Sequence, residues 1–116
     1  MGGKASRNKG ASSERIVCHI INEALGTDLH RELEQSRSGR NDITLGKYRW
    51  EIKRQEKLSI PMWWKQAVAS CGDGDVPVLC FRRSREEWKV CITLEELLLL
   101  IKHASKDIDF RYERKV

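Results

Sequence analysis

The sequence of 116 residues predicts a single α/β domain in which helices pack on a mixed β-sheet. Three observations predict this fold. Short runs with a period of two residues, typical of strands, alternate with longer segments that have a helical apolar period. Their order is helix, three strands, helix, two strands, helix, and no internal repeat is present. The length suffices for one hydrophobic core and little more.

The N-terminal part of the chain is predicted to hold a basic arm and a first helix. Residues 1–10 are rich in Gly, Lys, Arg and Ser and have no apolar period, so we expect a flexible arm. Ser12 or Ser13 can cap a helix that ends near Leu25, with Gly26 as its stop. The positions expected to be buried in this helix are Ile16, Val17, Ile20, Ile21 and Ala24.

A first strand is predicted from about Leu29 to Gln35. The loop that follows, residues 36–40, carries two hydroxyl groups and two guanidinium groups. Ser and Gly favour a polar surface turn there, whereas the same hydroxyl and guanidinium groups could contact phosphate. We prefer phosphate contact, because this loop directly precedes Asp42.

Residues 41–53 are predicted to form a β-hairpin. Gly46 stands in the first central position of a two-residue type II′ turn, where φ must be positive. Counting from this turn places Leu45 opposite Tyr48 and Asp42 opposite Glu51. Because strand side chains alternate, the hairpin has an apolar face and a polar face. The apolar face comprises Ile43, Leu45, Tyr48, Trp50 and Ile52, and the polar face comprises Asp42, Thr44, Arg49, Glu51 and Lys53.

The polar face of this hairpin suits a divalent cation. Two carboxylates opposite each other in an antiparallel pair lie roughly 5 Å apart and repel each other. Mg²⁺ prefers one or two carboxylates together with water and phosphate oxygens, so it would turn this repulsion into binding. Lys53 lies roughly 7 Å beyond Glu51 and could steady an attacking hydroxide. The alternative interpretation is a strand end at Asp42 and an ordinary solvated strand face.

The C-terminal half is predicted to contain a helix from about Pro61 to Ser70, since Pro suits a first helical turn. Its residues Trp63, Trp64, Ala67 and Val68 are expected to pack in the core or an interface. Residues 71–75 form a loop, and its Asp73-x-Asp75 pattern is interpreted as a turn rather than a calcium site. Two strands are expected at residues 76–81 and 88–92, around the arginine-rich turn 82–85. We interpret this turn as solvated, and the alternative interpretation is a contact with the DNA backbone.

Residues 93–96 form a capping box that opens the last helix. Within this helix we expect Leu94, Leu97, Leu98 and Ile101 to face inward. The additional Leu99 and Leu100 make the helix apolar on more than one side, which favours a dimer interface.

Charge and cysteine usage narrow the class of protein. The net charge of +5 and the isoelectric point near 9.2 predict attraction to nucleic acid through phosphate contacts, which carry no base information. The four cysteines, Cys18, Cys71, Cys80 and Cys91, have no CxxC spacing, so we expect reduced residues rather than zinc ligands. The apolar run at residues 97–101 is too short to cross a bilayer, and we expect an intracellular protein.

Asp42 and the run Glu51-Ile52-Lys53 resemble the Asp…Glu-x-Lys signature of the PD-(D/E)XK nucleases. The chain is most similar to archaeal-type Holliday junction resolvases and their phage-encoded relatives. The resemblance runs from about Arg7 to about Ile101 and departs at Asn41, where the family name has proline. It implies a restriction-endonuclease-like core with the order α-β-β-β-α-β-β-α, a nuclease domain at residues 11–104 and a C-terminal tail at residues 105–116.

The resemblance also implies an activity and a set of site residues. The activity is structure-specific DNA cleavage by phosphodiester hydrolysis, most similar to that of a Holliday junction resolvase. Such an enzyme would use Mg²⁺, with Mn²⁺ as a substitute, and act as a homodimer in the cytoplasm of a prokaryote or a phage-infected host. Catalytic candidates are Glu14, Asp42, Glu51 and Lys53. Metal ligands would be Asp42, Glu51, the Ile52 carbonyl and, through water, Glu14. DNA-binding candidates are Lys4, Arg7, Lys9, Arg15, Ser36, Arg37, Ser38, Arg40, Arg54 and Gln66.

Several alternatives remain open from the sequence. Glu14 is equally well interpreted as a first-turn carboxylate favoured by the helix dipole. The chain could be another nuclease of the same group, acting on nicks, flaps, single strands or restriction and repair substrates. It could also be a non-catalytic DNA-binding module. A protein-interaction domain with an incidental basic surface would show neither tight DNA binding nor magnesium dependence.

Overall fold

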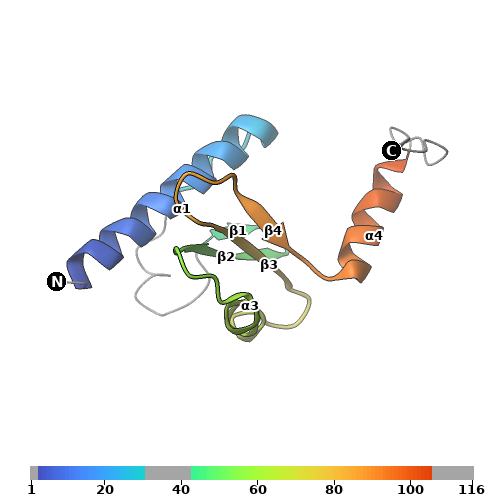
Figure 1. Ribbon diagram of the computed structural model, residues 1–116. Helices are drawn as coiled ribbons and strands as arrows, with labels where there is room; N and C mark the ends of the chain where they lie inside the picture. Colours follow the sequence, from blue (N-terminus) through green and yellow to red (C-terminus); the bar gives the residue numbers. More distant parts are fainter. Residues whose placement is uncertain (1–2, 31–42, 106–116) are drawn as a thin grey trace, which may run out of the picture.

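A mixed β-sheet is the centre of the computed structural model, which describes residues 3–30 and 43–105, with side chains from Ser12 onward (Figure 1). Its described strands are β1 (Ile43–Leu45), β2 (Tyr48–Arg54), β3 (Val76–Arg82) and β4 (Lys89–Cys91), in chain order. β1 and β4 are antiparallel to their neighbours, whereas β2 and β3 are parallel. The helices are α1 (Gly3–Leu25), α3 (Ile60–Ala69) and α4 (Leu94–His103). The predicted α/β class is confirmed.

The hairpin between β1 and β2 has the predicted turn and register. Gly46 has φ of +58°. Among the described non-glycine residues, positive φ is found at Arg85 and not at Lys47. Lys47 therefore has negative φ, which is the combination that a type II′ turn needs. Leu45 pairs with Tyr48 and Ile43 with Trp50. The turn chemistry alone sets which hairpin side chains share a face.

α1 covers one face of the sheet, and Figure 1 shows it on the side opposite to α3. The core on the α1 side consists of buried residues from α1 and from alternate positions of the strands: Val17, Cys18, Ile21, Ile43, Ile52 and Cys80. Ile20 and Ala24, predicted as buried, are exposed. The prediction assumed a wide apolar stripe, but the sheet covers only the narrow stripe around Val17 and Ile21.

The start of α1 also differs from the prediction. The helix begins at Gly3 rather than at Ser12 or Ser13, so residues 3–10 are helical instead of forming an irregular arm. Lys, Arg and Ala favour helix, and no proline interrupts residues 3–25. A helix that is anchored by packing at one end can extend beyond the core, because each added residue closes one more backbone hydrogen bond.

The first predicted strand is not seen where it was expected to begin. Leu29 and His30 are outside any strand, and the remainder, up to Gln35, lies outside the described residues. The side chain of Asn22 accepts a hydrogen bond from the Leu29 N–H at 2.7 Å and donates one to the Leu29 carbonyl at 2.9 Å. Because both backbone groups of Leu29 are occupied, this residue cannot pair with a neighbouring strand.

α3 covers the other face of the sheet, as a connection between the parallel strands β2 and β3. Pro61 lies in its first turn, and the predicted helix is confirmed to within one residue at each end. Trp63 packs on Leu79 and Phe81, with the Trp63 and Phe81 ring centroids 6.4 Å apart. Val68 was predicted to pack inward but is exposed, since only the stripe containing Trp63 and Ala67 faces the sheet.

α4 extends away from the sheet, as Figure 1 shows in orange and red. The predicted cap is present, because the Thr93 hydroxyl accepts a hydrogen bond from the Glu96 N–H at 3.1 Å. The expected inward packing is wrong for the three leucines, whereas Ile101 is half-buried. Leu94 is 71% exposed, Leu97 and Leu98 are also exposed, and the buried residue of α4 is Glu96. The apolar period is real, but the described sheet does not reach under this helix.

The expected strand from Trp88 to Ile92 is present in shortened form as β4. All four cysteines are free in the structure, with Cys18 and Cys80 buried. Among the described helices, none combines the length and the apolar character that crossing a lipid bilayer requires.

Candidate active site

β2 places the side chains of Glu51 and Lys53 on one face of the sheet. The Lys53 Nζ lies 3.7 Å from the Glu51 Oε2, and the two side chains are 21% and 16% exposed respectively. Their partners in the parallel ladder are Phe81 and Leu79, which pack against α3. The pair therefore lies beside an apolar core, where water screens the charges less than at an open surface.

The position of Asp42 next to this pair remains a prediction, because Asp42 lies outside the described residues. The observed pairing of Ile43 with Trp50 is consistent with the prediction, since the next pair of an uninterrupted antiparallel ladder would be Asp42 and Glu51. The predicted phosphate-binding loop with Ser36, Arg37, Ser38 and Arg40 also lies outside the described residues.

Glu14 is buried in α1, with 8% of the residue exposed, next to the fully buried Ser13. It lies in the middle of the helix because α1 begins at Gly3, so its interpretation as a first-turn carboxylate is wrong. Burial and then the nearby Glu14 carboxylate raise the pKa of the Cys18 thiol. Glu14 belongs to α1, which packs on the Ile43 and Ile52 side of the sheet, whereas Glu51 and Lys53 of β2 are on the face towards α3.

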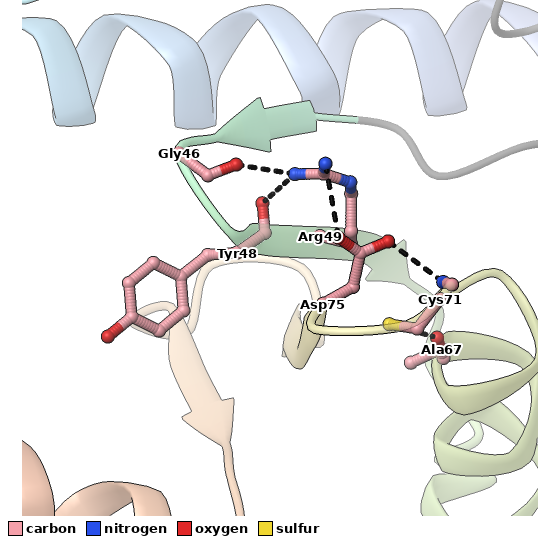
Figure 2. A network of polar contacts seen from close by, with 7 residues as sticks. Gly46, Tyr48, Arg49, Ala67, Cys71 and Asp75 are labelled. Atoms are coloured by element: carbon pink, nitrogen blue, oxygen red, sulfur yellow. Dashed lines mark hydrogen bonds and ion pairs between the residues drawn. The ribbon is translucent and has the colours of Figure 1, made fainter.

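Arg49 shares the polar face but has a structural partner. Figure 2 shows its guanidinium between the hairpin turn and Asp75. Nη1 donates to the Gly46 carbonyl at 2.6 Å, and Nη2 lies 3.2 Å from the Asp75 Oδ1. The Asp75 Oδ2 accepts a hydrogen bond from the Gly72 N–H at 2.8 Å. Asp75 therefore ties the loop after α3 to the hairpin, in agreement with the prediction of a turn.

The remaining DNA-binding candidates are spread over the fold. Arg15 is exposed on α1 and Gln66 is exposed on α3, on opposite sides of the sheet. Arg54 ends β2, and its Nη2 donates to the Ser84 hydroxyl at 3.3 Å. Lys4, Arg7 and Lys9 lie in the first half of α1. Arg15 and Gln66 therefore do not share one face of the sheet.

Sequence reasoning missed the contact between Arg82 and Trp88. Arg82 is the register partner of Arg54 on β3, and its guanidinium carbon lies 4.5 Å from the centre of the Trp88 ring. From the sequence, Arg82 was expected in the following turn, because the parallel register of β2 and β3 depends on long-range packing. The apolar run before Arg82 was the available signal that this residue still belongs to a strand.

The donor set fits a hard divalent cation. Carboxylate and backbone carbonyl oxygens suit Mg²⁺ or Mn²⁺ better than zinc. Residues 12–30 and 43–105 contain no group of three or more His, Cys, Asp or Glu side chains that could hold a metal. Of the two carboxylates in the predicted metal site, the described residues include Glu51, and the other would come from Asp42.

A protein-family model described as "Phage putative PDDEXK endonuclease" matches residues 5–115 of the chain. The match includes all the described strands, α3, α4 and most of α1, together with Glu51 and Lys53. No curated protein and no solved structure gives a match.

Proposed function

The chain belongs to the phage PDDEXK endonuclease family, and we propose that it is a metal-dependent DNA endonuclease whose active site includes Glu51 and Lys53. Membership confirms the resemblance to the PD-(D/E)XK nucleases and their phage-encoded relatives. The observation that carries the proposal is the placement of the Glu51-x-Lys53 run, because strand alternation and the confirmed hairpin register bring both side chains to one face.

We propose that Asp42, Glu51 and the Ile52 carbonyl hold one or two Mg²⁺ ions, with Mn²⁺ as a substitute. Nucleases of the PD-(D/E)XK group generally use divalent metals. When bound, Mg²⁺ lowers the pKa of a coordinated water and stabilises charge on the scissile phosphate. Asp42 and Glu51 would orient this site through their carboxylate oxygens, and their mutual repulsion would be relieved on binding.

Lys53 would position the attacking oxygen and offset the charge of the phosphorane-like transition state. Its ammonium group already lies beside Glu51, so it would need little reorganisation to reach a phosphate bound at the proposed metal site. Glu14 would act through water on the metal shell, which requires the metal to lie within reach of both α1 and β2. The loop with Ser36, Arg37, Ser38 and Arg40 would hold the scissile strand, and Arg15, Arg54 and Gln66 would contact DNA together with the basic residues of the first half of α1.

For the substrate, we propose a four-way DNA junction, which would make the enzyme a Holliday junction resolvase acting in recombination and repair in a phage-infected host. Resolution needs two coordinated cuts, and a two-fold homodimer supplies one site per subunit. Support for self-association comes from α4, where five exposed leucines lie on a helix that the described sheet does not cover: Leu94, Leu97, Leu98, Leu99 and Leu100. Such a surface is unfavourable in water unless a partner covers it.

The substrate proposal is tested with a labelled synthetic four-way junction and a linear duplex of the same arm sequence. Each is incubated with the protein and either Mg²⁺ or EDTA. We expect symmetric Mg²⁺-dependent cuts in the junction and none in the duplex. Equal cutting of both would identify a general nuclease of the same group, such as a flap, nick or restriction and repair enzyme. Tight binding without cleavage of either would favour a non-catalytic DNA-binding module.

The dimer proposal is tested separately by sedimentation equilibrium of the wild-type chain and of the variant Leu98→Glu. A charged side chain in the centre of α4 would oppose burial of this helix against a second copy. We expect a dimer for the wild type and a monomer with unchanged circular dichroism for the variant. A wild-type monomer at micromolar concentration would contradict this use of α4.

A further inference from the structure

Two arginines lie side by side at the carboxyl ends of the parallel strands. Arg54 ends β2, Arg82 ends β3, and the two are partners in the β2–β3 register. Paired residues on neighbouring strands lie about 4.8 Å apart at the backbone and point to the same face of the sheet. Both side chains are half-buried. Two guanidinium groups held in this way repel each other, because neither can lose its proton.

Neither arginine of this pair has a carboxylate partner among the described residues. Arg54 donates to the Ser84 hydroxyl at 3.3 Å, and Arg82 donates to the Glu86 carbonyl at 3.2 Å, so both contacts are to neutral acceptors. Two other described arginines have a carboxylate partner: Arg49 pairs with Asp75 at 3.2 Å, and Arg83 lies 3.9 Å from Glu86. Within residues 12–30 and 43–105, the arginine pair, Arg54 and Arg82, therefore has uncompensated positive charge.

The arginine pair also has donors without acceptors. The Nε atoms of Arg54 and Arg82 are buried and have no hydrogen-bond partner in the described structure, and the same holds for the indole Nε1 of Trp88. The Trp88 ring lies against the Arg82 guanidinium. Buried donors are nearly always paired in folded proteins, because an unpaired one destabilises the fold. A cluster of such donors indicates a missing acceptor of negative charge.

The turn beside the arginine pair is held in an unfavourable backbone conformation. Arg85 has φ of +66°, a left-handed conformation that disfavours any side chain with a Cβ. The Ser84 N–H donates to the Glu56 Oε1 at 3.1 Å, which fixes the turn against the segment after β2. The exposed guanidinium of Arg85 is thus held on the loop next to Arg54 and Arg82. Backbone strain of this kind concentrates at binding sites.

We propose that the arginine pair, with Arg85 at its edge, binds a backbone phosphate of DNA. A phosphate group offers several acceptor oxygens and negative charge, and guanidinium groups bind it in bidentate geometry. This proposal rests on the proposed nuclease function for the identity of the polyanion. Lys53 and Arg54 are consecutive in β2, so their side chains point to opposite faces of the sheet. A DNA strand cleaved at Glu51 would therefore have to pass around the carboxyl ends of β2 and β3 to reach the arginine pair.

The test is the salt dependence of DNA binding, measured by fluorescence anisotropy in EDTA so that no cleavage is needed. Loss of one phosphate contact lowers the slope of log Kd against log salt by about 1. We expect this loss, with roughly tenfold weaker binding, for Arg54→Gln. Arg83→Gln serves as the matched control, because Arg83 is already paired with Glu86, and its slope should equal that of the wild type.

Arg82→Lys provides a second variant, since lysine retains the charge and the contact with Trp88 but loses the bidentate geometry. We expect weaker binding with an unchanged slope and an unchanged unfolding temperature. A wild-type slope and affinity for Arg54→Gln would overturn the proposal. A third outcome is that inorganic phosphate raises the unfolding temperature of the wild type but not of Arg54→Gln, while both bind DNA equally well. The site would then bind a small phosphate ligand, and the DNA assignment would be wrong. Because binding is read without cleavage, an inactive protein would leave this result interpretable.

Discussion

The Glu51 Oε2 and the Lys53 Nζ lie 3.7 Å apart on the face of β2 that packs towards α3. Each side chain is largely shielded from water by the neighbouring core. The distance is longer than that of a tight hydrogen bond, so the lysine lies close to the carboxylate without forming a short hydrogen bond to it. This relationship is consistent with the proposed role of Lys53 beside a metal-binding Glu51.

Lys53→Met should reduce the cleavage rate by at least about a hundredfold while leaving DNA binding within a factor of three, because the ammonium group would act mainly in the transition state. Single-turnover cleavage and anisotropy measure the two effects. Lys102→Met, on α4, is the matched control and should cleave like the wild type. Equal activity of Lys53→Met and the control would remove Lys53 from the mechanism.

Tyr48→Phe should loosen α4 without unfolding the sheet. The Tyr48 hydroxyl donates to the Glu96 Oε1 at 2.8 Å, and this hydrogen bond, together with burial and the charge of Glu96, raises the pKa of Tyr48. A hydrogen bond to a charged group contributes about 1.5 to 3 kcal/mol, so amide hydrogen exchange in α4 should accelerate about tenfold or more. Lys47→Met, which removes an ion pair at 3.9 Å in which the lysine is largely exposed, should have a smaller effect. Unchanged exchange in Tyr48→Phe would show that another contact holds α4.

Stability should fall steeply at alkaline pH because of Cys80. Burial raises the pKa of this thiol from 9.0 to about 12. The raised pKa means that the folded state keeps the proton that the unfolded state loses, so the stabilisation is complete below pH 9 and is lost between pH 9 and 12. Three pH units correspond to at most about 4 kcal/mol.

Urea denaturation at several pH values between 8 and 11 tests this prediction for Cys80. Cys80→Ala should be less stable than the wild type at pH 8, because a cavity remains, yet it should lose less stability as the pH rises. Val78→Ala, in the same strand and equally buried, should keep the pH dependence of the wild type. Parallel curves for Cys80→Ala and the wild type would assign the alkaline loss to other groups.

Leu79→Ala should destabilise the fold by about 2 to 5 kcal/mol, because Leu79 is fully buried between α3 and the sheet and its truncation leaves a cavity. Met62→Ala, on the exposed side of α3, should change the free energy of unfolding by less than about 0.5 kcal/mol. Thermal unfolding of the two variants at equal concentration compares them. Similar losses of stability in the two variants would mean that the core between α3 and the sheet does not stabilise the fold as its packing indicates.

The parts of the fold that were predictable from the sequence depend on local chemistry. Gly46 set the hairpin register, Pro61 marked the start of α3 and Thr93 capped α4. The errors involve tertiary contacts. The side chain of Asn22 occupies the backbone of Leu29, and the leucines of α4 extend past the sheet that was expected to cover them. No local pattern contains this information, because each outcome depends on which distant segment is within reach.

The same division holds for the candidate site. Glu51 and Lys53 are two residues apart on one strand, so alternation alone brought them together. Arg54 and Arg82 are joined by a parallel pairing across the α3 connection, which a linear pattern does not specify. Glu14 depends on how α1 begins and packs, and its expected place in a first helical turn was wrong because the helix extends to Gly3.

The most direct test of the central claim is Mg²⁺-dependent cleavage of a labelled junction by the wild type and by Asp42→Asn and Glu51→Gln, at equal protein concentration and with DNA binding measured in parallel. We predict that the wild type cleaves the junction and that EDTA abolishes this cleavage. In both variants the cleavage rate should fall by at least about a hundredfold, with DNA binding retained. Wild-type cleavage rates in Glu51→Gln would contradict the account, because the metal site would then lie elsewhere on the protein.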